Sequence, residues 1–132
     1  MIEIVGKEQL EEFIWENINA KKVVVIYFGA EWCGPCQQLK KKIASDEAKE
    51  AMPDLVVGHI DMDEDQNNEL SQTYKIKSLP TQIFVTLKGT LIVEIKKIMG
   101  LDWTNFISTY GDIKASEELS NIANEPIIPS NA

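Results

Sequence analysis

The sequence contains no long hydrophobic run and relatively few basic residues. No window approaches the roughly 18 consecutive apolar residues that a membrane-spanning helix needs. The chain has 13 basic residues against 21 acidic ones, which gives a formal net charge of −8. Such a surface repels phosphate backbones and anionic lipids. We therefore expect no nucleic acid and no membrane among the partners of this protein.

The first 20 residues also lack the pattern of a secretory signal. A signal has a basic start and an apolar middle, whereas here the apolar positions are interrupted by five glutamates, Glu3, Glu8, Glu11, Glu12 and Glu16. We therefore expect a cytoplasmic protein. An extracytoplasmic protein whose signal peptide had been removed, with Met1 added, would show the same pattern.

The 132 residues are enough for one domain with a single core. Apolar residues at helical spacing predict a surface helix over 6–21. Two continuous runs rich in β-branched residues, 23–28 and 55–60, predict strands covered on both faces. The segment 36–52 between these runs reads as a helix that is broken near Ser45, where the serine can cap a second short piece.

The second half of the chain continues this alternation of elements. Residues 65–74 form a weaker helical segment, and 81–87 with 91–95 flank a Lys-Gly-Thr turn as an antiparallel hairpin. Asp102 can cap a last helix that carries Trp103, Phe106, Ile107 and Tyr110 on one face. A short edge strand over 2–5 and a short helix over 116–123 complete the prediction, and the prolines at 126 and 129 end regular structure in a tail that frays.

This order of elements predicts an α/β fold. We expect a central mixed sheet with a parallel core and an antiparallel hairpin, with helices on both faces. The predicted domain covers residues 1–111, and residues 112–132 form a C-terminal extension.

The only two cysteines, Cys33 and Cys36, lie in the stretch EWCGPC. A structural disulfide is disfavoured because it closes a very short loop, where the entropic stabilisation is smallest. A zinc site needs four ligands, and beyond these cysteines the sequence offers one histidine, His59. A redox pair explains more: a strand followed by a helix that begins near Cys33 places this sulfur at a helix N-terminus, which favours the thiolate.

In this interpretation Cys33 is the nucleophile. Cys36, one turn inside the helix, is shielded and suited to attack the mixed disulfide that Cys33 forms. Pro35 is compatible with the first turn of a helix. No metal or organic cofactor is required for this chemistry.

The stretch VVVIYFGAEWCGPC, the later SLPT and Gly100 resemble the thioredoxin family over roughly residues 2–111. The resemblance implies a thioredoxin fold, with Cys33 as nucleophile, Cys36 as resolving thiol, Trp32 as a flat wall beside them and Pro80 as a cis-proline facing the disulfide. It also implies an uncharged client-docking patch around the sulfurs, formed by Trp32, Gly34, Pro35, Leu79, Thr81, Gly100 and Leu101.

Several positions depart from the family pattern. Thioredoxins usually carry a buried aspartate and a partner lysine where this chain has Tyr27 and His59. A tyrosine, with a reference pKa of about 10, is not a base at pH 7, whereas imidazole, at about 6.5, is one. We therefore consider that His59, held by Tyr27 through a hydrogen bond or a shared water, accepts the proton of Cys36. In the alternative, Tyr27 only fills space and Glu31 or bulk water takes the proton.

The stretches LKKKIASDEAKEAM and VVGHIDMDEDQNNEL resemble the thiol:disulfide interchange branch of the family more than general-purpose thioredoxin. The expected function is a monomeric thiol:disulfide oxidoreductase that reduces disulfide-containing client proteins and is recharged by a reductase as electron donor. Two alternatives stay open: an extracytoplasmic disulfide oxidase or isomerase, and a protein-binding module on the same fold with little turnover.

Overall fold

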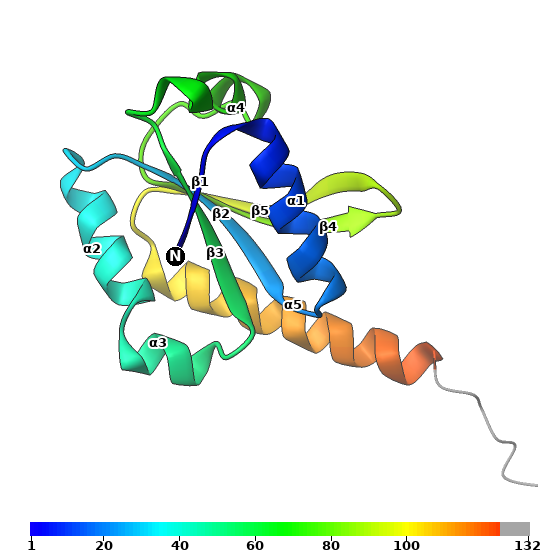
Figure 1. The fold of residues 1–132 in the computed structure, drawn as a ribbon. Helices are drawn as coiled ribbons and strands as arrows, with labels where there is room; N and C mark the ends of the chain where they lie inside the picture. Colours follow the sequence, from blue (N-terminus) through cyan, green and yellow to red (C-terminus); the bar gives the residue numbers. More distant parts are fainter. Residues whose placement is uncertain (125–132) are drawn as a thin grey trace, which may run out of the picture.

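The computed structural model describes the backbone of residues 1–124 and the side chains of residues 1–119. The elements follow one another in the order expected for an α/β fold (Figure 1): β1 (Ile2–Ile4), α1 (Gly6–Asn19), β2 (Val23–Gly29), α2 (Gly34–Ile43), α3 (Asp46–Ala51), β3 (Leu55–Asp61), a 3-10 turn η1 (Asp65–Asn67), α4 (Asn68–Thr73), β4 (Thr81–Lys88), β5 (Leu91–Met99) and α5 (Trp103–Asn124).

The five strands form one mixed sheet in the order β1-β3-β2-β4-β5. Strands β1, β3 and β2 are parallel, and β4 and β5 run antiparallel as a hairpin at the other edge. A thioredoxin-type arrangement with a parallel core and an antiparallel hairpin is therefore confirmed. Strand β2 lies at the centre, and all seven of its residues are buried, as its continuous apolar sequence predicted.

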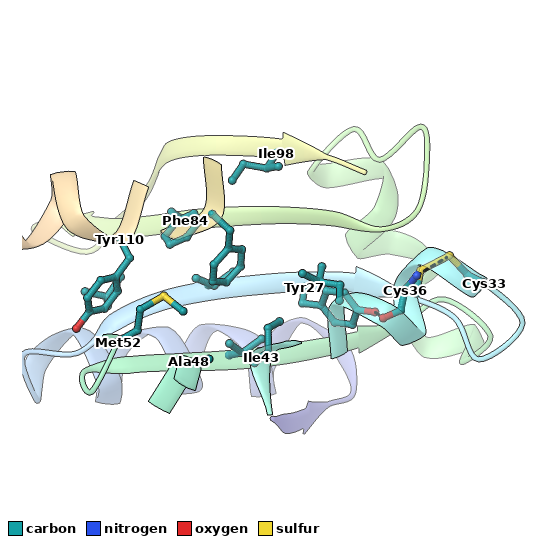
Figure 2. Packing of buried hydrophobic residues seen from close by; sticks show 14 of the residues in the cluster. Tyr27, Cys33, Cys36, Ile43, Ala48, Met52, Phe84, Ile98 and Tyr110 are labelled. Carbon is teal, nitrogen blue, oxygen red and sulfur yellow. Dashed lines mark hydrogen bonds between the residues drawn. A yellow bond between two sulfur atoms is a disulfide. The ribbon is translucent and has the colours of Figure 1, made fainter. Parts of the chain in front are cut away.

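Helices cover both faces of the sheet, because alternate side chains of β2 point to opposite sides. The odd-numbered residues, with Tyr27 nearest to the cysteines, face a core shared with α2, α3 and α5 (Figure 2). The even-numbered residues, which end with Phe28, face a second core shared with α1 and α4. The two cysteines lie at one end of the first core.

The break in the helical segment after the cysteines is confirmed. Helix α2 ends at Ile43 and α3 begins at Asp46. Ser45 caps α3, since its Oγ accepts a hydrogen bond from the Ala48 backbone N–H at 3.2 Å.

Two expectations for the last helix are wrong. The helix does not stop and restart at residue 116, because Ile113 packs against the core beyond Gly111 and the Lys114 ammonium lies 2.8 Å from an Asp54 carboxylate oxygen. Ile107 is exposed, since the buried stripe of α5 is narrower than expected and holds Phe106 and Tyr110. The division into a domain and an extension at residue 111 stays a prediction, and the expected frayed tail lies outside the described residues.

Candidate redox site

Strand register brings three distant segments together at one end of the sheet. Phe28, at the end of β2, pairs with Thr81 at the start of β4, and Thr81 pairs with Met99 at the end of β5. The turn that follows β2, the loop that precedes β4 and the turn that follows β5 therefore meet. The first carries the cysteines, the second Leu79 and Pro80, and the third Gly100 and Leu101.

The cysteines begin helix α2 and are joined by a disulfide, with their Cα atoms 5.2 Å apart. Cys33 is the N-cap residue, and its Sγ accepts a hydrogen bond from the Cys36 backbone N–H at 3.3 Å. Cys33 is 6% exposed, whereas Cys36 is fully buried. The predicted helix start at the first cysteine and the greater exposure of Cys33 are confirmed.

The Leu79–Pro80 peptide bond is cis, as the resemblance implied. The Pro80 carbonyl accepts a hydrogen bond from the Gly100 N–H at 2.7 Å, so the two neighbouring turns are joined directly. Thr81 is buried, and its hydroxyl donates to the Ser78 carbonyl at 2.8 Å. Leu79 and Leu101 are half-buried and pack against the core cluster that contains both cysteines.

Trp32, Gly34 and Pro35 are exposed around the sulfurs. The Trp32 indole is 72% exposed and is held by a hydrogen bond from its Nε1–H to an Asp63 carboxylate oxygen at 2.9 Å. Trp32 and Leu79 also line a cavity of about 350 Å³, whose lining includes Lys77 but neither cysteine. The surface around Trp32 and Leu79 is therefore partly apolar, with Asp63 and Lys77 as charged neighbours.

Tyr27 lies directly behind Cys36 (Figure 2). Its hydroxyl donates a hydrogen bond to the Cys36 carbonyl at 2.9 Å. Burial, followed by the negative charge of Glu3, raises the pKa of Tyr27 to about 12, so the phenol keeps its proton. A Cβ at Gly29 would lie only 2.7 Å from the Tyr27 hydroxyl oxygen, so the glycine leaves the space that this large side chain occupies.

The expected hydrogen bond between Tyr27 and His59 is wrong. The Tyr27 hydroxyl is bonded to Cys36, and the two rings meet only in a tilted contact with centroids 5.0 Å apart. The His59 Nδ1 instead lies 2.7 and 2.9 Å from the two carboxylate oxygens of Glu3 on the neighbouring edge strand. Both Glu3 and Tyr27 are neighbours of His59 in strand register, but Glu3 provides the hydrogen bond to the imidazole and Tyr27 only ring packing.

Sequence reasoning missed four residues at this end of the protein. They are Glu3, which contacts His59; Asp63, which holds Trp32; Gln37, whose side-chain amide donates to the Glu31 carbonyl at 3.1 Å; and Gln82, whose amide donates to the Gly100 carbonyl at 3.1 Å. Only Gln82 carried a usable signal, since a glutamine inside an apolar strand is unusual and calls for a buried partner.

Comparison with known proteins decides the family. A family model described as Thioredoxin matches residues 3–108. The chain belongs to the thioredoxin family. A thioredoxin from Chlamydia pneumoniae is 32% identical over 108 residues, which cover 82% of this chain and 93% of that protein. A putative thioredoxin 2 from Streptomyces coelicolor is 39% identical over 79 residues, 60% of this chain and 53% of that protein.

The structure of Trichomonas vaginalis thioredoxin has the same fold, with a TM-score of 0.71 and 29% identity over 86% of this chain and 96% of that one. Membership of the thioredoxin family, together with a cysteine pair that forms a disulfide, supports a thiol:disulfide oxidoreductase. Within residues 1–124, no helix combines the length and the apolar character needed to cross a membrane.

Proposed function

We propose that this protein reduces disulfide bonds in client proteins by dithiol exchange through Cys33. The observation that supports this most is the unequal placement of the two sulfurs. Cys33 caps helix α2 and keeps 6% of its surface exposed, whereas Cys36 is fully buried one turn inside. A helix N-terminus favours the thiolate, so Cys33 is the sulfur that attacks and Cys36 the sulfur that completes the exchange.

The exchange proceeds in two balanced steps. The Cys33 thiolate attacks a client disulfide, which forms a mixed disulfide and releases one client sulfur as a thiolate. Cys36 then loses its proton and attacks the Cys33 sulfur, which releases the second client thiolate and forms the Cys33–Cys36 bond. The client gains two electrons and the protein loses two, so a reductase must return the protein to its dithiol form.

The surface around Cys33 suits an extended client segment. Leu79 makes no backbone hydrogen bond to any part of the chain that the structure describes, so its N–H and C=O are available to a client backbone. Trp32, Gly34, Pro35, Gly100 and Leu101 complete an uncharged patch around this position. Thr81 is buried next to Pro80, at the base of this patch.

We also propose that the protein acts as a monomer in the cytoplasm.

A trapping experiment tests this function. The variant Cys36→Ser, incubated with insulin, should accumulate a mixed disulfide on a non-reducing gel that dithiothreitol releases, because the resolving thiol is gone. Wild-type protein should reduce insulin without accumulating the adduct, and Cys33→Ser should trap nothing because the remaining sulfur is buried. Failure of wild type to reduce insulin, together with no adduct in Cys36→Ser, would contradict the proposal.

A further inference from the structure

A row of polar side chains crosses the sheet beneath helix α2. Strand register aligns Glu3 on β1 with His59 on β3, His59 with Tyr27 on β2, and Tyr27 with Gln82 on β4. Residues paired in register point to the same face of a sheet. These four side chains therefore form a continuous line from the exposed edge of the sheet to its centre, on the face that carries Cys36.

His59 and Glu3 form the outer half of this row. The His59 side chain is 11% exposed, and its Nδ1 contacts both Glu3 carboxylate oxygens, at 2.7 and 2.9 Å. A carboxylate accepts hydrogen bonds and donates none, so Nδ1 carries the proton and Nε2 is the free acceptor of the neutral ring. Glu3 is 62% exposed, so the pair is connected to solvent.

A cavity of about 340 Å³ lies beside this pair, next to α2. Since one water takes up about 30 Å³ in the liquid, the cavity has room for several. Its lining includes Glu3, Tyr27 and His59, and its other charged groups are Glu31 in the turn before α2, Lys40 on α2 and Asp61 at the end of β3. Cys36 is not part of this lining; Tyr27 lines the cavity, and its hydroxyl donates to the Cys36 carbonyl.

We propose that His59, held by Glu3, accepts the proton of Cys36 through water in this cavity. This inference rests on the proposed function and assigns the group that activates the resolving thiol. The Cys36 thiol gives its proton to water hydrogen-bonded to His59 Nε2, and the resulting thiolate attacks the Cys33 sulfur. The proton leaves to solvent at the Glu3 edge. Glu3 is a positioning residue, which fixes the tautomer and stabilises the imidazolium that forms.

Tyr27 has a different role in this arrangement. Its buried phenol keeps its proton and therefore acts only as a donor to the Cys36 carbonyl. The aromatic ring packs against the imidazole and closes the space between β2 and β3. Of the groups in the row, His59 has the neutral ring nitrogen that can accept a proton, and Glu3 holds this ring in place.

The two exchange steps can be measured separately with a glutathione disulfide that carries a self-quenching fluorophore on each half. The first half is released in a second-order step when reduced Cys33 attacks, and the second half in a first-order step when Cys36 resolves. Wild-type resolution should slow as the pH falls from 8 to 5.5, because a protonated imidazole has no free lone pair.

His59→Gln should slow resolution at pH 7.5 by about tenfold or more, within the range typical of general base catalysis, and should leave the attack by Cys33 within about twofold of wild type. Glu3→Gln should slow resolution several-fold at pH 8 and change the pH profile, because the imidazole loses the carboxylate that positions it. Glu12→Gln, with the same charge change on the exposed face of α1, should follow the wild-type profile.

Glu31→Gln tests the rival acceptor in the same cavity. The proposal is overturned if Glu31→Gln slows resolution while Glu3→Gln follows the wild-type pH profile. It is also overturned if His59→Gln and Glu3→Gln resolve at the wild-type rate, as the control Glu12→Gln should. If Glu3 and His59 only stabilised the fold, their variants would lower the urea midpoint without changing the pH profile of resolution. That result would also contradict the proposal. If wild type itself attacks but never releases the second half, the proposed function fails, which is a separate result.

Discussion

The two sulfurs occupy different positions at the start of one helix, and their different proposed roles follow from this. Cys33 lies at the N-cap, where its sulfur accepts the Cys36 backbone N–H and the N-terminus of α2 favours negative charge. Cys36 is packed in the core with Tyr27 behind it. In the proposed mechanism, this helix turn separates the attacking sulfur of Cys33 from the more deeply buried sulfur of Cys36.

Alkylation should distinguish these two thiols. In the reduced protein at pH 7, iodoacetamide should modify Cys33 first, because its sulfur is more exposed and more readily ionised. Peptide mapping by mass spectrometry after short reaction times gives the ratio of the two products. Equal labelling of the cysteines, or faster labelling of Cys36, would contradict the assignment.

Gly29 and Tyr27 form a coupled pair behind the site. Replacing Gly29 by Ala places a methyl group 2.7 Å from the Tyr27 hydroxyl, so we expect destabilisation of about 1–3 kcal/mol, as for other overpacked cores. The matched change Gly111→Ala puts a methyl group in open space on the exposed surface of α5. It should stabilise the protein by about 0.5–1 kcal/mol, because alanine favours the helix. Urea unfolding measures the change in unfolding free energy for both variants. If both variants were stabilised, or both destabilised, this explanation would be refuted.

The helices and strands were predictable because each carries its own pattern. The buried run of β2, the apolar stripe of α1 and the capping Ser45 of α3 are local signals, and each lies within one or two residues of its predicted position. The continuation of α5 past Gly111 was not predictable, because it depends on contacts of Ile113 and Lys114 with distant parts of the chain.

The cysteine pair, the cis bond at Pro80 and the turns that meet around them were predictable from motifs, whereas the partner of His59 was not. Glu3 and His59 are 56 residues apart in sequence, and Glu3 lies on a strand of only three residues. A short edge strand has almost no pattern of its own. Its register against β3, which determines the contact, follows only from the folded sheet.

An ion pair between Lys114 and Asp54 connects helix α5 to the end of the sheet that lies opposite the cysteines. The Lys114 ammonium lowers the pKa of Asp54 by hydrogen bonding and by its charge, and Asp54 in turn raises the pKa of Lys114. Because the Asp54 pKa is lower in the folded protein than in the unfolded chain, the pair stabilises the fold above the ordinary aspartate pKa of about 3.9 and loses this effect as the pH falls further.

Lys114→Gln should therefore destabilise the protein at pH 7, and this loss should shrink as the pH falls below the ordinary aspartate pKa and Asp54 takes up its proton. The loss should be below about 1 kcal/mol, as for other solvent-accessible pairs, and should shrink in high salt. The control is Lys22→Gln, whose ammonium lies farther from Asp54, at 3.8 Å, and which should have a smaller effect. An equal loss of unfolding free energy at pH 7 and below the ordinary aspartate pKa would contradict this explanation.

The direction of electron flow depends on how strongly the protein as a whole stabilises its reduced form. Thiol:disulfide oxidoreductases that act as oxidants have a strongly stabilised thiolate in the reduced form. In the described part of this protein, Cys33 Sγ accepts one hydrogen bond, from the Cys36 N–H, and none from a lysine or histidine side chain. The proposed reductase therefore requires that the Cys33 thiolate be stabilised mainly by the N-terminus of α2.

Equilibrium titration of the cysteine pair against glutathione tests this central claim most directly. The fraction of dithiol, read from the mass shift after alkylation, gives the reduction potential at pH 7. We expect a value more negative than about −230 mV, near the value of about −270 mV that is typical of reducing thioredoxins. A value of about −180 mV or above, in the range of isomerases and oxidants, would contradict the assignment of this protein as a disulfide reductase.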